Sequence, residues 1–451
     1  MTFSLCRCFG TLALAMAAAT SAAHEGPLDP SFGDGGMRAY GFQAIDGGNS
    51  DQAIVGCATA NGTFTVMGSA SSERRIVTMR LLKDGSIDTG FSADGKESFV
   101  LPGTYTHFAP GLCQPDGHMV AARSITAPDG EQHLQIFRVL KHTGQLDEGF
   151  GNAGVVTIDL DQWIPGLDKE EMPLGVNVLA NGDLAVSGRV ALRTDEERGF
   201  VVLLGADGSV RRVAAVANLR SRTATTVVDA PDGRLWVFGQ NGRIPGAYRA
   251  TLNRTTLAWE AVLEYRAPAN QWAFVGNGRV VDAQTVVLAA GATPMGTWNT
   301  WPQLIVFRAA SVSAISLPLP VLDEKVLYVD ATFGGQGVTV LPGRRVLFAA
   351  TAEDVSINTE LGVHFAMAQI GDDAGGDRID PSFGIAGAQT AAFRPRSPAC
   401  ASEPPLHYYG RLTLWLDRPS FVGSVYADCD GNGSGSDYLV MRLRSGSDVV
   451  Q

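Results

Sequence analysis

The chain has 451 residues, of which 45% are hydrophobic and 18% charged, and its formal net charge is −11. This apolar content indicates a folded chain and excludes a disordered one. The negative balance, with no basic run to compensate for it, excludes nucleic acid as a partner bound through a basic surface. Repeat folds of this length form single units, so the length does not require several domains.

Residues 1–23 have the pattern of a secretory signal peptide. Arg7 is their only charged residue, residues 12–19 are a short apolar core, and small residues at 21–23 precede an expected cleavage before His24. The apolar run is too short to span a bilayer. We therefore expect an exported chain, periplasmic or extracellular, whose mature part (24–451) is one domain without a membrane span.

Four cysteines follow the signal peptide, and in an oxidising compartment four allow three disulfide connectivities. We favour a bond between Cys400 and Cys429, which bracket one repeat unit near the C-terminus. Cys57 and Cys113 occupy matching places in neighbouring repeats, and each can be an ordinary buried strand cysteine.

A nine-residue phrase rich in turn residues recurs along the mature chain. It reads LDPSFGDGG at 28–36, IDTGFSADG at 87–95, LDEGFGNAG at 146–154 and IDPSFGIAG at 379–387. Phe32, Phe91 and Phe150 of the phrase lie 59 residues apart, and Phe383 follows after four further steps of about 58 residues. Seven units therefore fit, at approximately 28–86, 87–145, 146–208, 209–259, 260–314, 315–378 and 379–446.

Two further landmarks also occur seven times. One is a tight turn between apolar runs, often Asn-Gly or Asp-Gly, whose central residues need a positive φ. The other is an alternating apolar strand that ends each unit, such as IVTMRLL at 76–82. The first unit predicts strands at 36–42, 53–59, 63–69 and 75–82, and no helical periodicity is convincing. The turns lie at 60–62, 114–117, 180–182, 231–233, 282–284, 342–343 and 417–419.

Four short strands per unit, repeated seven times, predict an all-β fold, a β-propeller of seven four-stranded blades. A solenoid is the alternative, but the units are long for a β-helix rung and no capping segment is evident. The sequence leaves the strand phase open. Because the repeats begin at a phrase and end after a final strand, whole repeats could close the ring without mixing strands from the two ends.

The phrase, the Pro-Asp-Gly turn at 115–117 and a final strand leading into DGSID at 84–88 together resemble the delta-60 repeat family. That family consists of large bacterial secreted or surface proteins built from tandem units of this length and expected to form propellers. The likeness is close in units one to three and seven, whereas units four to six keep the strands and lose the phrase. The shared motif is a turn signature, so the resemblance implies a propeller and supplies no catalytic or binding residue.

Asp29, Asp88, Asp147 and Asp380 repeat at one position of the phrase. A residue that recurs in every clear unit is more economically a turn-maker that accepts backbone N–H bonds than a catalytic group. No G-x-S-x-G elbow, phosphate loop or zinc signature occurs. We therefore predict no catalytic residue, although acids or histidines from several blades could meet at a channel without leaving a linear motif.

The segment DCDGNGSGSD at 428–437 looks like the opening of a calcium loop. Asp428, Asp430 and Asn432 place oxygen ligands at alternate positions around a tight turn, and Asp437 could replace the missing closing acid. The alternative is a Gly/Ser/Asp-rich connection between the last two strands, tied by Cys429. No cofactor other than calcium is a candidate.

Two loops break the repeat and are candidate binding segments. Residues 159–173 lengthen the third unit and are acidic around Trp163, and residues 293–303 carry Trp298 and Trp301 in the fifth. Loops on a rigid scaffold often hold the binding function, and tryptophans can stack on sugars or anchor a partner. The alternative is that these indoles only cover the end of a blade.

The sequence thus favours a monomeric, exported, non-catalytic propeller that binds a protein or a glycan. The first alternative is a propeller hydrolase or lyase with a site at the mouth of the central channel. A purely structural surface component is the second.

Overall fold

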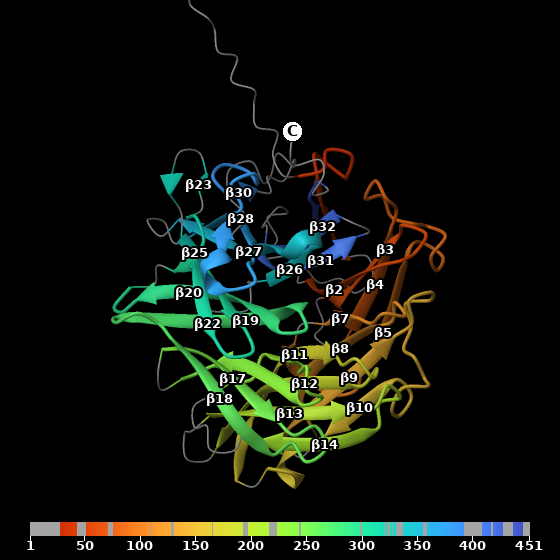
Figure 1. Ribbon diagram of the computed structural model, residues 1–451. Helices are drawn as coiled ribbons and strands as arrows, with labels where there is room; N and C mark the ends of the chain where they lie inside the picture. Colours follow the sequence, from red (N-terminus) through yellow and green to blue (C-terminus); the bar gives the residue numbers. More distant parts are fainter. Residues whose placement is uncertain are drawn as a thin grey trace, which may run out of the picture.

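The protein is a seven-bladed β-propeller, as the sequence predicted: seven sheets surround a common centre (Figure 1). Helical structure in the described residues is limited to three one-turn 3-10 helices. The computed structural model describes residues 28–42, 51–70, 75–109, 111–127, 130–164, 166–192, 197–215, 223–242, 245–297, 300–319, 321–322, 325–326, 328–330, 337–354, 359–391, 408–415, 418–426 and 436–444.

In each blade the first strand lies nearest the centre, and the following strands are added outward in an antiparallel sheet. Blade A contains β2 (Gln52–Ala58), β3 (Phe64–Ala70), β4 (Arg75–Leu81) and β5 (Lys96–Val100). Blade B contains β6 (Thr104–Phe108), β7 (Leu112–Cys113), β8 (Met119–Thr126), β9 (Gln132–Val139) and β10 (Val155–Ile158). Blade C contains β11 (Leu167–Val178), β12 (Leu184–Leu192), β13 (Glu197–Leu204) and β14 (Val210–Ala215). Blade D contains β15 (Thr226–Asp229), β16 (Leu235–Gln240), β17 (Gly246–Leu252) and β18 (Trp259–Arg266).

Blades E and F follow the same order. Blade E contains β19 (Gln271–Asp282), β20 (Thr285–Pro294), β21 (Trp301–Phe307) and β22 (Val312–Ser316). In blade F, β25 (Tyr328–Asp330) and β26 (Gly337–Leu341) pair with β27 (Arg345–Asp354), and β29 (Arg378–Ile379) and β30 (Ala388–Ala391) pair with β28 (Thr359–Gln369). A small hairpin of β23 (Val321–Leu322) and β24 (Lys325–Val326) lies between these two blades in the chain.

The ring closes with strands from both ends of the chain. Blade G contains β31 (Tyr408–Trp415), β32 (Arg418–Tyr426) and β33 (Ser436–Arg442), and its outermost strand is β1 (Met37–Tyr40). Closure by whole repeats, which the sequence permitted, therefore does not occur. The strand that follows a phrase completes the preceding blade, so blades and sequence repeats are offset by one strand.

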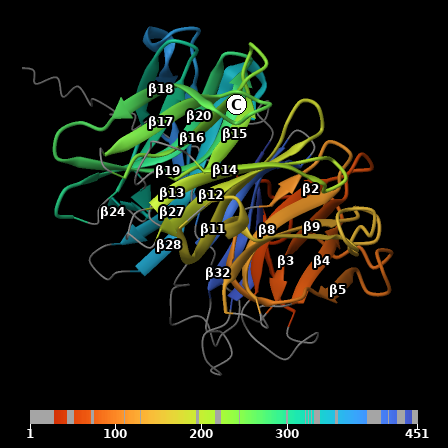
Figure 2. The ribbon, with the colours of Figure 1, turned by 90° about the horizontal axis from the view of Figure 1, so that it is seen from below.

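The hydrophobic core consists of seven clusters, each between two neighbouring blades. Figure 2 shows this packing for blades A and B, where β2 to β5 lie beside β8 and β9. Both faces of the inner strands are covered, so every residue of β3 is buried although a half-exposed strand would alternate. The phrase phenylalanines belong to this core; Phe32 and Phe150 are fully buried.

The phrase is the turn between the third and fourth strands. In the second copy, Oδ1 of Asp88 accepts from the Gly90 N–H (3.0 Å), and Oδ2 accepts from Nε of Arg80 (2.7 Å), whose guanidinium lies 4.7 Å from the Phe91 ring centroid. Gly95 ends the phrase at φ +87°, where a Cβ would lie 2.2 Å from the Ile87 side chain. The prediction that these aspartates accept backbone N–H bonds is confirmed. The other copies pair Asp29 with Arg442, Asp147 with Arg138 and Asp380 with Arg345.

Candidate functional site

The two faces of the propeller carry different kinds of connection. Because strands alternate in direction, the links from first to second strand and from third to fourth strand lie at one face, and all other links lie at the opposite face. The first face, here called the regular face, holds the tight turns and the phrases. The second, the irregular face, holds the links between blades and between second and third strands, including residues 159–164 and 295–297.

All described members of the predicted sites lie at the irregular face. Trp163 lies in the link from blade B to blade C, and Trp301 begins β21 in blade E. Asp437 is the second residue of β33, opposite Val425. Blade D separates the two tryptophans, so they do not form one site. The signal peptide (1–23), Trp298, Asp428, Asp430, Asn432, Cys400 and Cys429 lie outside the described residues.

The Trp163 loop is held by buried residues on either side of its indole. Asp159 caps the one-turn helix η1 (Leu160–Gln162), because its Oδ1 accepts from the N–H two residues on (3.0 Å). The Ile164 N–H donates to the Leu160 carbonyl (2.8 Å), and both of these side chains are buried between blades B and C. Trp163, between them, is 49% exposed. The fold thus fixes the loop and presents the indole to solvent.

Glu171, in β11, lies beneath this loop and is a buried acid that the sequence interpretation missed. Its side chain is 3% exposed, Oε1 accepts from the Leu160 N–H (3.2 Å), and Oε2 has no hydrogen-bond partner among the described residues. Burial raises the pKa of Glu171 to about 8, and the charges of Asp159 and Asp161 act in the same direction. The carboxyl is therefore protonated at neutral pH. The only sequence signal is that Glu171 belongs to the lengthened segment of the third unit.

Blade E presents a second apolar area at the irregular face. Trp301 is 39% exposed opposite Ala292, and Trp272, at the start of β19 opposite Thr293, is 37% exposed. Met295, in the link between β20 and β21, is also exposed. Register puts the two tryptophans on opposite faces of the sheet, at the same end. Trp272 was not predicted, because nothing local distinguishes it from a core residue of an inner strand.

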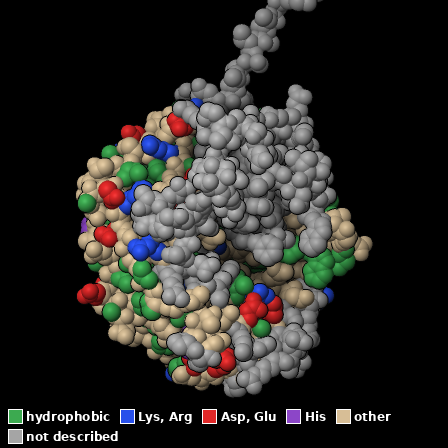
Figure 3. All heavy atoms as spheres, turned by 180° about the vertical axis from the view of Figure 1, so that it is seen from behind, with side chains coloured by type: hydrophobic (Ala, Val, Ile, Leu, Met, Phe, Trp, Pro, Cys, Tyr) green, Lys and Arg blue, Asp and Glu red, His purple; other side chains and the backbone are tan. Residues whose placement is uncertain are grey.

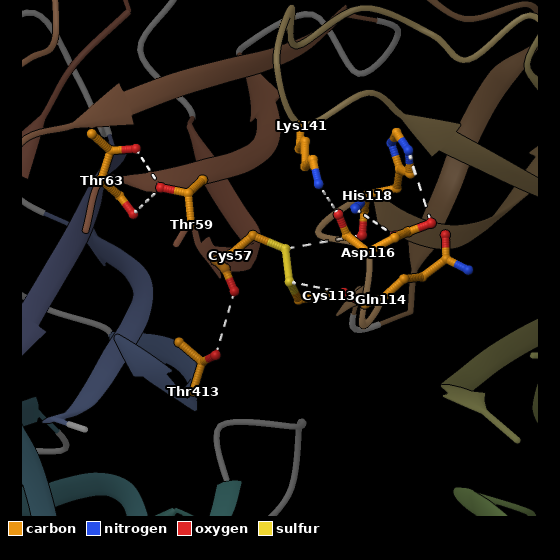
Figure 4. Close-up of a disulfide and its surroundings, with 10 residues drawn as sticks. Cys57, Thr59, Thr63, Cys113, Gln114, Asp116, His118, Lys141 and Thr413 are labelled. Carbon is orange, nitrogen blue, oxygen red and sulfur yellow. Dashed lines mark hydrogen bonds and ion pairs between the residues drawn. A yellow bond between two sulfur atoms is a disulfide. The ribbon is translucent and has the colours of Figure 1, made fainter. Parts of the chain in front are cut away.

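Cys57 and Cys113 form a disulfide, contrary to the interpretation of each as an ordinary buried cysteine (Figure 4). The bond joins β2 to β7, the innermost strands of blades A and B, with the Cα atoms 5.3 Å apart. On the other side of β2, Oγ1 of Thr413 in β31 donates to the Gly56 carbonyl (3.4 Å). Matching positions of neighbouring repeats become adjacent where the inner strands converge. The matching positions of Cys57 and Cys113 were therefore a signal for this bond in the sequence.

The described residues do not hold a ready metal centre. Among them no group of three or more His, Cys, Asp or Glu side chains is placed to bind a metal ion. Only Asp437 of the predicted calcium ligands is described, so the calcium site stays a prediction. No helix in the described part of the chain is long and apolar enough to cross a membrane. Positive and negative side chains are interspersed over the described surface in Figure 3, which shows no large patch of one sign there.

Comparison with known proteins agrees with the architecture. The family described as "Domain of unknown function (DUF5122) beta-propeller" matches residues 59–91, which span one hairpin, β4 and the start of the second phrase. A propeller repeat family therefore fits the chain. The search of curated proteins found no match.

Solved structures with a similar arrangement have little sequence in common with this chain. One is an α-L-arabinanase of Penicillium chrysogenum complexed with arabinobiose, with a TM-score of 0.45, 12% identity and coverage of 75% of this chain and 93% of that one. Another is the polysaccharide lyase Uly1, with a TM-score of 0.45, 10% identity and coverage of 90% and 92%. A Hadza microbial sialidase has a TM-score of 0.41, 12% identity and coverage of 69% and 66%. These likenesses do not assign an activity.

Proposed function

We propose that this protein is an exported repeat propeller of the delta-60 type that binds a glycan or a protein partner through its irregular face, without catalysing a reaction. The observation that supports this proposal is the segregation of the two faces. The tight turns and the phrases, whose aspartates pair with arginines of neighbouring strands, occupy the regular face. The exposed indoles of Trp163, Trp272 and Trp301 lie at the irregular face. A rigid scaffold with irregular loops on one side is a common arrangement for binding.

Trp163 is the best-supported contact residue. Its loop is anchored by the buried side chains of Leu160 and Ile164, so little conformational freedom is lost when a ligand covers the indole. An indole offers a broad apolar face and one N–H donor, which suits the C–H face of a sugar ring or a pocket on a protein.

Export is supported by the Cys57–Cys113 disulfide, because such bonds persist in oxidising compartments. With these two cysteines bonded to each other, Cys400 and Cys429 are the cysteines of the mature chain that remain to form the second, predicted pair. Mass spectrometry of the unreduced, protease-digested protein tests both bonds. A digest with free thiols at Cys400 and Cys429 would contradict the second.

Substitution of the exposed tryptophans tests the proposed binding face. On a glycan array and in capture of surface proteins, Trp163→Ala and Trp301→Ala should each weaken binding about tenfold or more, as loss of an aromatic anchor does. Ile385→Ala is the matched control, since Ile385 is 73% exposed in a phrase of the regular face. Binding that is unchanged in both tryptophan variants, or equally reduced in the control, would contradict the proposal.

Glu171 supports a second candidate function, a hydrolase or lyase. A carboxyl that stays protonated at neutral pH can donate a proton to a leaving group. Its carboxyl is covered by the loop at 159–164, so a substrate would reach it only after that loop opens. Depolymerisation of a polysaccharide by the wild-type protein that is lost in Glu171→Gln would favour this function over simple binding, and turnover that survives the substitution would remove Glu171 as the proton donor.

A further inference from the structure

Two arginines lie on innermost strands of the ring. Arg279 is in β19 of blade E and Arg411 is in β31 of blade G, and β26 of blade F lies between these strands (Figure 1). The strands approach closely: a Cβ on Gly337 of β26 would lie 3.0 Å from the Leu412 nitrogen. The guanidinium group of Arg411 reaches β19, where it contacts Asn277, two residues from Arg279, and the charge of Arg279 acts on it.

Neutral groups hold the two guanidinium groups in place. The Asn277 amide is satisfied when its Oδ1 accepts from Nη1 and Nη2 of Arg411 (2.6 and 3.1 Å) and its Nδ2 donates to the Thr225 carbonyl (2.8 Å). Nη1 of Arg279 donates to the Gly278 carbonyl (3.0 Å). These contacts orient both side chains and do not balance either charge.

Neither arginine forms an ion pair with a carboxylate among the described residues. Burial, and then the charge of Arg279, lower the pKa of Arg411 to about 9, and burial also lowers the pKa of Arg279. Two other buried arginines are balanced, since Arg308 pairs with Asp377 and Arg442 with Asp29. Buried Arg249, in contrast, donates to the backbone carbonyls of Arg308 and Ala309.

Two like charges enclosed by protein without a counter-charge lower the stability of the folded state. Both residues nevertheless keep part of their surface accessible to solvent, so they are not sealed in the core. A small anion from solvent could therefore reach them.

We propose that the central channel is an anion-binding site in which Arg279 and Arg411 together bind one oxyanion group. Guanidinium groups present several N–H donors in a plane, which matches carboxylate, phosphate and sulfate oxygens. The group can be an inorganic anion or the acidic group of a larger ligand such as a uronic acid. The site is independent of the tryptophans at the irregular face, so it stands whether or not those residues bind a partner.

Calorimetry and thermal unfolding with defined anions test the site. Sodium phosphate, sulfate, acetate and glucuronate are titrated separately, against sodium chloride at equal ionic strength, into the mature wild-type protein and its variants. We expect saturable binding of at least one oxyanion to the wild type, with a rise in Tm that follows occupancy. Arg279→Gln and Arg411→Gln should each raise the Kd tenfold or more. Arg266→Gln is the control, because Arg266 is 69% exposed, and its Kd should equal that of the wild type.

The four anions distinguish the sources of the bound group. Tighter binding of acetate and glucuronate would indicate a carboxylate ligand, and tighter binding of phosphate or sulfate an inorganic or ester anion. Absence of saturable oxyanion binding to the wild type would overturn the proposal. So would an unchanged Kd in both Gln variants.

A purely structural role predicts a different pattern of stability. If the arginines only filled the channel, Arg279→Gln would lower Tm equally in every buffer. An anion site predicts that Arg279→Gln melts at or above the wild-type temperature without oxyanions and below it when they saturate the wild type. To the described part of the chain Arg279 donates a single hydrogen bond, to the Gly278 carbonyl, so this variant serves even if Arg411→Gln, which frees Asn277, fails to fold.

Discussion

Replacing Glu171 with glutamine should stabilise the protein at neutral pH and leave it unchanged in acid. The pKa of the buried carboxyl is raised from 4.5 to about 8, chiefly by burial. Below pH 4.5 the folded and unfolded states both hold the proton. Between pH 4.5 and 8 the unfolded state releases a proton that the folded state keeps, so the free energy of unfolding falls as the pH rises. Above pH 8 both states are ionised and the loss is complete.

The size of the effect follows from the same shift. A difference in pKa changes stability by about 1.4 kcal/mol per pH unit, so at pH 7 the wild type should have lost about 3 kcal/mol relative to pH 4.5. Glutamine has nearly the same shape and carries no proton to lose. The entropy of unfolding, about 2.1 cal/mol/K per residue, converts this into a rise in Tm of about 3 °C at pH 7 for a chain of 451 residues.

The assay is thermal unfolding of the wild type and Glu171→Gln from pH 4.5 to 8.5, and the informative quantity is the difference in Tm at each pH. Glu170→Gln is the control, because the neighbouring Glu170 side chain is 46% exposed and pairs with Arg189 at 2.9 Å. It should show no gain that grows with pH. A Tm difference for Glu171→Gln that does not depend on pH, or a wild type that becomes the more stable protein at pH 8, would refute the reasoning.

A buried histidine and the disulfide give two further predictions of stability. His364 is fully buried with its Nε2 3.0 Å from the Pro318 carbonyl, and burial lowers its pKa to about 4, so stability should be lost as the pH falls from 6.5 to 4. His364→Gln should flatten this acid limb of a Tm–pH profile, and an unchanged limb would contradict the assignment. Replacing Cys57 and Cys113 together by serine should lower the free energy of unfolding by about 4 kcal/mol, the chain-entropy value for their separation of 56 residues. A reducing agent should bring the wild type to the Tm of this variant and leave the variant unchanged; a wild type insensitive to reduction would argue against the bond.

Local sequence was sufficient to predict the architecture because every repeat contains its own turn chemistry. The four strands predicted in the first unit correspond to β1 (Met37–Tyr40), β2 (Gln52–Ala58), β3 (Phe64–Ala70) and β4 (Arg75–Leu81), with ends displaced by no more than about two residues. Ring closure could not be predicted in this way. Both modes of closure use the same strands and turns, and they differ only in whether β1 pairs with β33 or with a strand of its own unit.

The sequence could name candidate site residues only in the segments that interrupt the repeat. Trp163 and Trp301 belong to irregular segments, so the sequence could name them as candidates, and the structure shows that both are exposed. Glu171, Trp272 and Arg279 could not be named from the sequence. Burial of Glu171 beneath a loop, exposure of Trp272 at the end of a blade and the place of Arg279 near the axis all depend on how the strands are arranged in the ring. A single arginine between apolar residues of a first strand, as in VGNGRVV at 275–281, was the available signal.

The ring explains why repeated and unrepeated residues have different roles. The repeated aspartate of each clear phrase pairs with an arginine on a neighbouring strand of the same blade, so the charge of this aspartate is balanced within the blade. At the axis, by contrast, seven inner strands converge, and a residue present in only one or two of them lies near residues of other blades. The Cys57–Cys113 bond and the contact of Arg411 with Asn277, near Arg279, both arise in this way. Selectivity for one ligand requires an asymmetric arrangement of binding groups. In a propeller the inner strands at the axis can carry such groups, because substitutions there leave the turns that determine the fold unchanged.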